Sequence, residues 1–220
     1  MNEYKSKAQD EAPDDGIDEA FSIDAETNDT VVTGTWLKSC FFYLTSQNKL
    51  NYIVSDKPVS YAFLEKPSQI LGYMQTQGCL FFVDGSNKIV SYEIPAAFYS
   101  AVSYAAAEDY ESMRGQLAKL ENDKYHDRVA RFLEVTNNLE EALSVVKNQE
   151  LKFEYAIKLE NIDEAYRIAI ESGLPAALKQ IGDLCLVKGH FDKAESSFKK
   201  SGDLASLLLM YSSLGMTMFD

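Results

Sequence analysis

The chain has 220 residues, of which 46% are hydrophobic and 25% charged, a composition typical of a globular protein with room for one or two domains. It carries 34 acidic and 21 basic residues, a formal net charge of −13, and no dense cluster of Lys and Arg. Such a chain repels nucleic-acid phosphates and anionic lipid head groups. We therefore expect no nucleic-acid partner and no direct electrostatic binding to membranes.

Targeting signals and cysteine usage predict a cytoplasmic protein. Residues 1–12 lack the apolar segment of a secretory signal. No stretch reaches the roughly 18 consecutive apolar residues of a membrane span, so we predict no transmembrane segment. The three cysteines, Cys40, Cys79 and Cys185, are odd in number and have apolar neighbours. This pattern favours buried, reduced thiols over disulfides.

The first 30 residues form a distinct zone of ten acidic residues and two lysines. With few apolar residues to bury, residues 1–30 are predicted to be an acidic, largely mobile leader.

Residues 31–94 carry the pattern of short β-strands separated by polar turns. The expected strands lie at about ten-residue spacing, at 36–45, 49–54, 58–63, 70–74, 79–83 and 88–94. This antiparallel meander suits a barrel, a sandwich or propeller blades. Six or seven strands are fewer than two four-stranded blades, and a propeller closes with about four blades or more. As blades, these strands would be the end of a propeller, with open edges, in a fragment of a longer polypeptide.

After Pro95 the helical period continues to the C-terminus, so residues 95–220 are predicted to be helical. The first three helices are expected at 96–107, 109–120 and 123–135. A short motif then recurs at spacings of 23 and 29 residues, as Asn138–Ala142, Asn161–Ala165 and His190–Ala194.

The repeated motif predicts helical hairpins. Its first residue is expected to cap a helix, and the acidic residues that follow favour the positive end of the helix dipole. Its alanine, at Ala142, Ala165 and Ala194, is expected where two helices cross closely. Such hairpins cover their apolar faces only by stacking, which indicates a tetratricopeptide-like α-solenoid of irregular period. The run at 207–211 is apolar nearly all round, so we expect it to be buried on several sides and to need a following helix.

The sequence contains no motif of catalysis, and we predict no catalytic, cofactor-binding or metal-binding residues. Its two histidines, His126 and His190, have no Cys or Ser beside them in a nucleophile motif, and Glu140-Glu141 is read as a helix N-terminus. Zinc, dinucleotide and phosphate-loop signatures are absent. The aromatic residues at 41–43 and 81–82 are interpreted as strand core, with a ligand-binding patch as the alternative.

The order of a β-meander, a linker at Pro95 and irregular helical hairpins resembles the middle of the β′ subunit family of coatomer, the COPI vesicle coat. The matching stretches are 34–41 with 48–52 (a strand pair late in the second propeller), 71–73 with 87–92 (the end of that propeller), and 128–134, 153–156 and 207–209 (the first solenoid hairpins). The resemblance covers about residues 15–215. Each stretch is a packing motif, and their shared order is what makes the resemblance specific.

The resemblance implies a non-catalytic coat component in retrograde Golgi-to-ER and intra-Golgi transport. It implies other coatomer subunits as partners, especially the α subunit through the solenoid, and indirect recruitment to the cytosolic face of Golgi membranes by an ARF-type GTPase. In that family dilysine cargo is read by the first propeller, which has no counterpart here, so no cargo-binding residue is carried over. The Trp-Asp dipeptide of WD repeats is also missing.

Two alternatives remain open at this stage. Another propeller-and-solenoid protein, such as an intraflagellar-transport or tethering component, shares the architecture. A stand-alone solenoid that binds peptides on its concave surface is the hypothesis from a different class.

Overall fold

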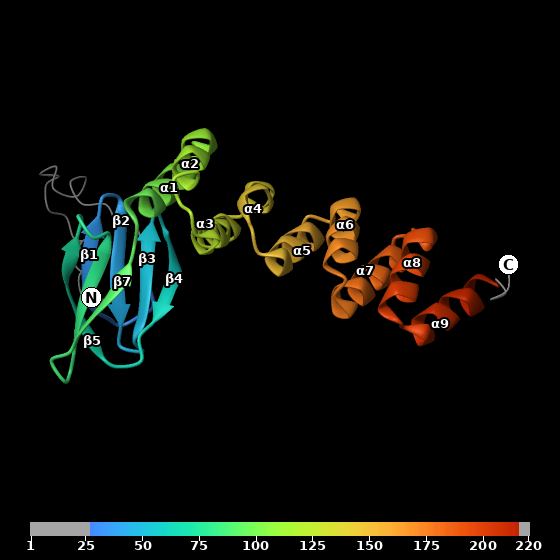
Figure 1. Ribbon diagram of the computed structural model, residues 1–220, viewed down its shortest axis with the longest axis horizontal. Coiled ribbons are helices and arrows are strands. Elements are labelled where there is room, and N and C mark those ends of the chain that lie inside the picture. Colours follow the sequence, from blue (N-terminus) through green and yellow to red (C-terminus); the bar gives the residue numbers. More distant parts are fainter. Residues whose placement is uncertain (1–26, 216–220) are drawn as a thin grey trace, which may run out of the picture.

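The computed structural model describes residues 27–215 of the chain. The predicted acidic leader at 1–30 therefore lies almost wholly outside the described residues. Figure 1 shows an elongated molecule with β-sheets at one end and a row of helices that leads to α9 at the other.

The strands form two separate antiparallel sheets in sequence order. The first sheet contains β1 (Val31–Leu37), β2 (Cys40–Thr45), β3 (Lys49–Val54) and β4 (Lys57–Phe63), and the second contains β5 (Ser68–Met74), β6 (Cys79–Asp84) and β7 (Ile89–Glu93). Neither sheet closes on itself. The prediction of partial propeller blades followed by a solenoid is confirmed.

Alternation along the strands places the large aromatic residues between the sheets and the first helices. Phe42 and Phe82 are completely buried, and the ring centroids of Phe42 and Tyr52 lie 5.4 Å apart. The two sheets are joined by hydroxyl groups, because Tyr61 Oη donates to the Glu93 carbonyl at 2.6 Å. Burial raises the pKa of Tyr61 to about 12, so this hydroxyl remains a donor.

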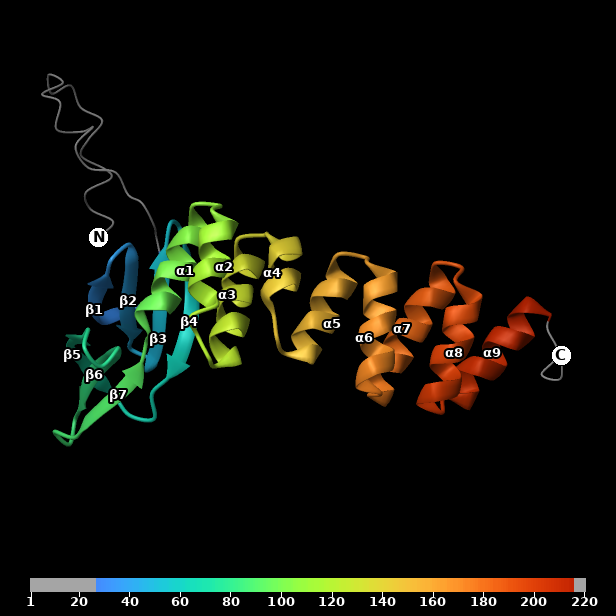
Figure 2. The ribbon, with the colours of Figure 1, turned by 45° about the horizontal axis from the view of Figure 1, so that its top comes forward.

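The helices pair as antiparallel hairpins that stack side by side (Figure 2). They are α1 (Ala96–Ala106) with α2 (Tyr110–Leu117), α3 (Asp123–Val135) with α4 (Leu139–Val145), α5 (Gln149–Lys158) with α6 (Ile162–Ser172), α7 (Pro175–Val187) with α8 (Phe191–Ser201), and then α9 (Leu204–Leu214). The second helix α2 is shorter than predicted. After Leu117 the hydrogen bonds change to the 3₁₀ pattern, in which the Lys119 and Leu120 amides donate to the carbonyls three residues earlier, those of Gln116 and Leu117.

The repeated motif lies where the second helix of three hairpins begins. Ala142, Ala165 and Ala194 are fully buried, as expected for close helix crossings. The predicted side-chain cap forms only at Asn161, which accepts from the Glu164 amide at 3.2 Å. The caps predicted at positions 138 and 190 were wrong.

The physical reason differs at the two positions. Asn138 turns its amide to Thr136 Oγ1 instead, at 3.2 Å. His190 has no short side-chain oxygen that could reach the first amides of α8.

The apolar side chains form two clusters that meet within α5. The first runs from the sheets through α4 to Leu151 and Tyr155, and the second runs from Phe153 and Ala156 to Met210. Alternate faces of α5 thus serve different clusters.

Two burial predictions were wrong in part. In the apolar run of α9, Leu207 and Met210 are buried, but Leu208 and Leu209 are 56% and 68% exposed, because α8 is the main packing partner of this helix within the described residues. Cys40 and Cys185 are buried as predicted, but Cys79 is half-buried because it begins β6 on the outward face of the second sheet. All three cysteines are free thiols.

Candidate interaction surfaces

Within residues 27–215, no group of three or more His, Cys, Asp or Glu side chains lies close enough to hold a metal ion. In the same range, no helix has the length and apolarity that a membrane crossing requires. The two histidines stand apart, His126 in α3 and His190 at the start of α8.

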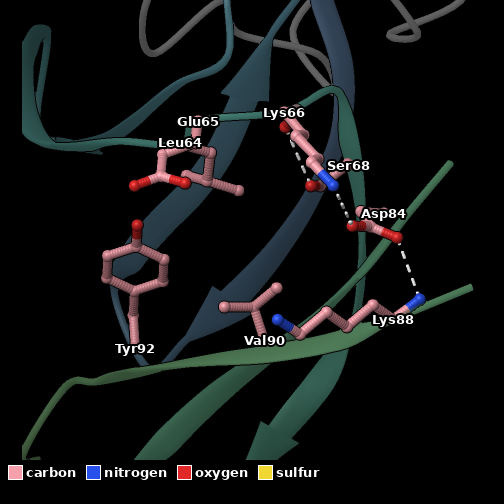
Figure 3. Close-up of a pocket in the computed structure, with 8 residues that line it drawn as sticks. All are labelled: Leu64, Glu65, Lys66, Ser68, Asp84, Lys88, Val90 and Tyr92. Atoms are coloured by element: carbon pink, nitrogen blue, oxygen red, sulfur yellow. Dashed lines mark hydrogen bonds and ion pairs between the residues drawn. The ribbon is translucent and has the colours of Figure 1, made fainter. Parts of the chain in front are cut away.

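The hollow in Figure 3 lies between the connection from β4 to β5 and the strands of the second sheet, with a volume of about 260 Å³. Its most buried polar group is Asp84, whose Oδ1 accepts the amides of Ser86 and Lys88 at 2.8 and 2.9 Å. The Lys66 ammonium lies 3.7 Å from the other oxygen. The Lys88 and Ser86 amides, with Lys66, hold the pKa of the Asp84 carboxyl below its usual value despite the opposing effect of burial. A carboxylate held this way fixes the β6–β7 turn and is a poor proton acceptor.

Exposed apolar side chains on the strands form the first candidate interaction surface. The large residues exposed there are Val31, Val32, Trp36, Phe63, Leu71, Met74, Ile89 and Val90. Trp36 is 67% exposed and lies 5.0 Å from the Phe41 ring, so aromatic area faces outward from β1 and β2. Apolar side chains that lie together at the surface, as Trp36 and Phe41 do, are typical of surfaces that another element or partner covers.

The second candidate surface is an apolar stripe on α9. Leu204 and Leu208 are one turn apart and Leu209 is adjacent, and all three are more than half exposed. Helix α9 lies at the end of the row of helices, after α8 (Figure 1). A helix that buries only Leu207 and Met210 presents the rest of its apolar surface to a further element.

A set of contacts fixes the solenoid rigidly to the sheets. The Arg128 guanidinium of α3 lies 3.7 Å from the centre of the Tyr61 ring in β4, a cation–π contact. Lys124 pairs with Glu93 at 3.2 Å, and Lys57 Nζ donates to the Val135 carbonyl at 3.2 Å. Phe98 of α1 is fully buried against Tyr52 and Tyr61. The sheets and the first hairpins therefore share one core.

Five connections between helices have the same turn, which sequence reasoning did not identify. In each, one residue adopts a left-handed conformation and the next amide donates to the carbonyl five residues earlier, at 2.7–3.0 Å. This is a Schellman closure of the preceding helix. The left-handed residues are Glu108, Asn137, Glu160, Gly189 and Gly202. Glycine and asparagine were the available signals, but no pattern marks Glu108 or Glu160, because side chains rarely adopt this conformation.

Exposed ion pairs join successive hairpins along the stack. They are Arg114 with Glu141, Glu134 with Lys158, Glu160 with Lys188, Asp163 with Lys193, and Lys179 with Asp203. Exposed pairs contribute little stability individually, so their main effect is on the relative placement of hairpins. Sequence reasoning missed these residues, because their partners are 24 to 30 positions away.

These observations define the class of the protein: partial propeller blades continued by an α-solenoid whose described surfaces suit protein contacts. Residues 103–219 match the family described as the COPA/B TPR domain, which covers more than half of the chain. The chain therefore belongs to this family, and its similarity to curated coatomer β′ subunits makes it a coatomer β′-like protein.

Curated relatives match across the junction between sheets and solenoid. The chain is 33% identical over 202 residues to coatomer subunit beta′-1 of Arabidopsis thaliana, 32% to coatomer subunit beta′-2 of Oryza sativa subsp. japonica, and 31% to coatomer subunit beta′ of Rattus norvegicus. Each match covers 92% of this chain and 22% of the relative. The chain thus spans about a fifth of the length of these proteins.

Proposed function

We propose that the chain is a non-catalytic structural component of the COPI vesicle coat. The observation that carries the proposal is the match to coatomer β′ subunits across 92% of the chain, which includes both the partial propeller and the solenoid. A propeller-and-solenoid protein of another transport system would share the architecture but not this continuous similarity.

In this role the solenoid provides contacts to other coat subunits, especially the α subunit. The apolar stripe at Leu204, Leu208 and Leu209 supplies exposed area for such a contact. The coat acts in retrograde Golgi-to-ER and intra-Golgi transport, on the cytosolic face of Golgi membranes. Recruitment there is indirect, through an ARF-type GTPase, since the net charge of −13 opposes direct binding to anionic lipids.

The domain division belongs to the same proposal. Residues 31–94 act as the last blades of a propeller and residues 95–220 as the solenoid, with 1–30 as an acidic leader.

The test is mass spectrometry of the endogenous protein, recovered from native extract with an antibody to residues 150–220. Co-recovery of the other coatomer subunits is the expected result. Recovery of ciliary or tethering proteins in their place, or of the chain without partners, would refute the coat function.

Two matched variants test whether the solenoid carries the contact. Leu208 in α9 and Leu71 in β5 are 56% and 57% exposed, so aspartate at either position places a charge on a comparable apolar surface. Leu208→Asp is expected to reduce recovery of coat subunits, and Leu71→Asp to retain it. The reverse pattern would assign the contact to the sheets.

A further inference from the structure

The connection between α4 and α5 lacks the Schellman closure that ends the preceding helix at the five connections described above. Its residues Val146 and Asn148 are extended, and none of the residues 146–148 adopts the left-handed conformation that closes the turns at Gly202 or Asn137. Backbone closure therefore does not fix the direction in which the chain leaves α4.

A side chain from α3, the first helix of the same hairpin, fixes the backbone of this connection instead. Asp127 Oδ1 in α3 accepts the amides of Lys147 and Asn148, both at 2.9 Å. Two consecutive amides on one carboxylate oxygen hold the local backbone direction firmly, because hydrogen bonds to a charged acceptor are the stronger ones. Asn148 in turn caps α5 by accepting the amides of Glu150 and Leu151. The position of Asp127 is thus transmitted to the start of α5.

A second carboxylate on the same face of α3 holds the other end of α5. Glu134 lies seven residues after Asp127, two helical turns or about 10 Å along the axis. It accepts from Tyr155 Oη at 3.0 Å and pairs with Lys158, both in α5. Helix α3 therefore holds α5 at both ends, through Asp127 at the residue that caps α5 and through Glu134 near its C-terminus.

The contacts of Asp127 and Glu134 lie where the two apolar clusters meet. Leu151 and Tyr155 belong to the cluster that includes the sheets, whereas Phe153 and Ala156 belong to the cluster of α6–α9. A change in the orientation of α5 relative to α3 would move the second cluster as a rigid unit relative to the first. Within the described residues, α5 is the only helix that contributes buried residues to both clusters. Its orientation relative to α3 therefore sets the angle between the clusters.

We propose that Asp127 is a positioning residue that sets the angle between the two halves of the solenoid, with Glu134 as its second anchor. The halves are α1–α4 with the sheets, and α5–α9. The inference rests on the proposed function only for its purpose, since a scaffold must present its distal surface at a defined angle. The contacts that carry the inference all lie within this chain and involve no partner.

The test measures that angle in the chain of 220 residues. Spin labels at Glu111→Cys in α2 and Lys200→Cys in α8, both exposed sites, report the distance between the halves, and Cys79→Ser removes the accessible native thiol. Asp127→Ala is expected to broaden the distance distribution or shift it. The matched control is Asp123→Ala, which removes the same charge from the first turn of the same helix, where Asp123 has no contact with the connection. An unchanged distribution in Asp127→Ala, or equal broadening in Asp123→Ala, would overturn the proposal.

Two further measurements separate positioning from a general loss of folding. Asp127→Asn keeps an oxygen that can accept both amides, so it should restore the wild-type distribution. In the unmodified protein, the amides of Lys147 and Asn148 should exchange with solvent at least about tenfold more slowly than unprotected amides. Exchange at the unprotected rate would show, without any variant, that Asp127 does not hold these two amides. None of these readouts requires coat subunits, so their failure would leave the proposed coat function standing.

Discussion

Gly182 offers a direct test of how closely α7 and α8 cross. A Cβ at Gly182 would lie 2.6 Å from Cε1 and 2.9 Å from Cδ1 of Phe198, whose ring is fully buried. Carbon atoms in contact prefer about 3.5–4.0 Å, so the ring would have to shift by about 1 Å. Overpacking of this kind costs about 1–3 kcal/mol.

The net effect of Gly182→Ala combines two opposing terms. Alanine is favoured over glycine inside a helix by about 1 kcal/mol. With about 2 kcal/mol for overpacking, the variant should lose about 1 kcal/mol of unfolding free energy, a fall in Tm of about 2–4 °C for a chain of this size.

Gly115→Ala is the matched control, because Gly115 lies inside α2 with no atom within 4 Å of its added Cβ. It should gain about 1 kcal/mol from helix propensity alone. Urea unfolding followed by circular dichroism measures both variants, and hydrogen exchange in α2 and α7 assigns each change to its hairpin. Equal stabilisation by both alanines would refute the close crossing at Phe198.

Three more predictions follow from buried groups. Ala165→Leu should cost about 1–3 kcal/mol by overpacking a fully buried crossing, and unchanged thermal stability would contradict the crossing. In the native protein Cys79 should react first with a thiol reagent, because burial raises the pKa of Cys40 to about 11 and also raises that of Cys185; rapid reaction of all three would be inconsistent with this core. Burial works to raise the pKa of Glu134, but its hydrogen bonds from α5 more than offset this and lower it, so stability from this carboxylate is present above the ordinary pKa of 4.5 and lost as the pH falls below it. Glu134→Gln should flatten the acid limb of stability against pH, and an unchanged slope would exclude the effect.

Local sequence patterns predicted most of the secondary structure. Alternation between polar turns marked most of the strands, and the helix at 123–135 was predicted with the bounds of α3. The single strand expected at 36–45 was wrong, because the chain turns at Lys38 and divides this stretch between β1 and β2. The three repeated alanines were also placed correctly in the core, because a small residue after a polar, acidic helix start has one main use in a hairpin. Each of these signals lies within a few residues of the feature it reports.

The errors and omissions share a cause. Asn138 and His190 occupy the expected positions before their helices, but whether a side chain caps depends on competing partners such as Thr136. Cys79 lies half-buried because strand register, and not its apolar neighbours, decides which face it occupies.

The sequence by itself determined the class of fold and the order of its parts, because strand and helix periods and turn residues are local properties of the chain. Only the tertiary structure decided which apolar side chains are exposed and how Asp127 and Glu134 contact the two ends of α5. Exposure of Leu208 and the reach of Asp127 across 20 residues depend on which helices stack together. Stacking arises from the summed packing of many side chains, and no short stretch of sequence records that sum.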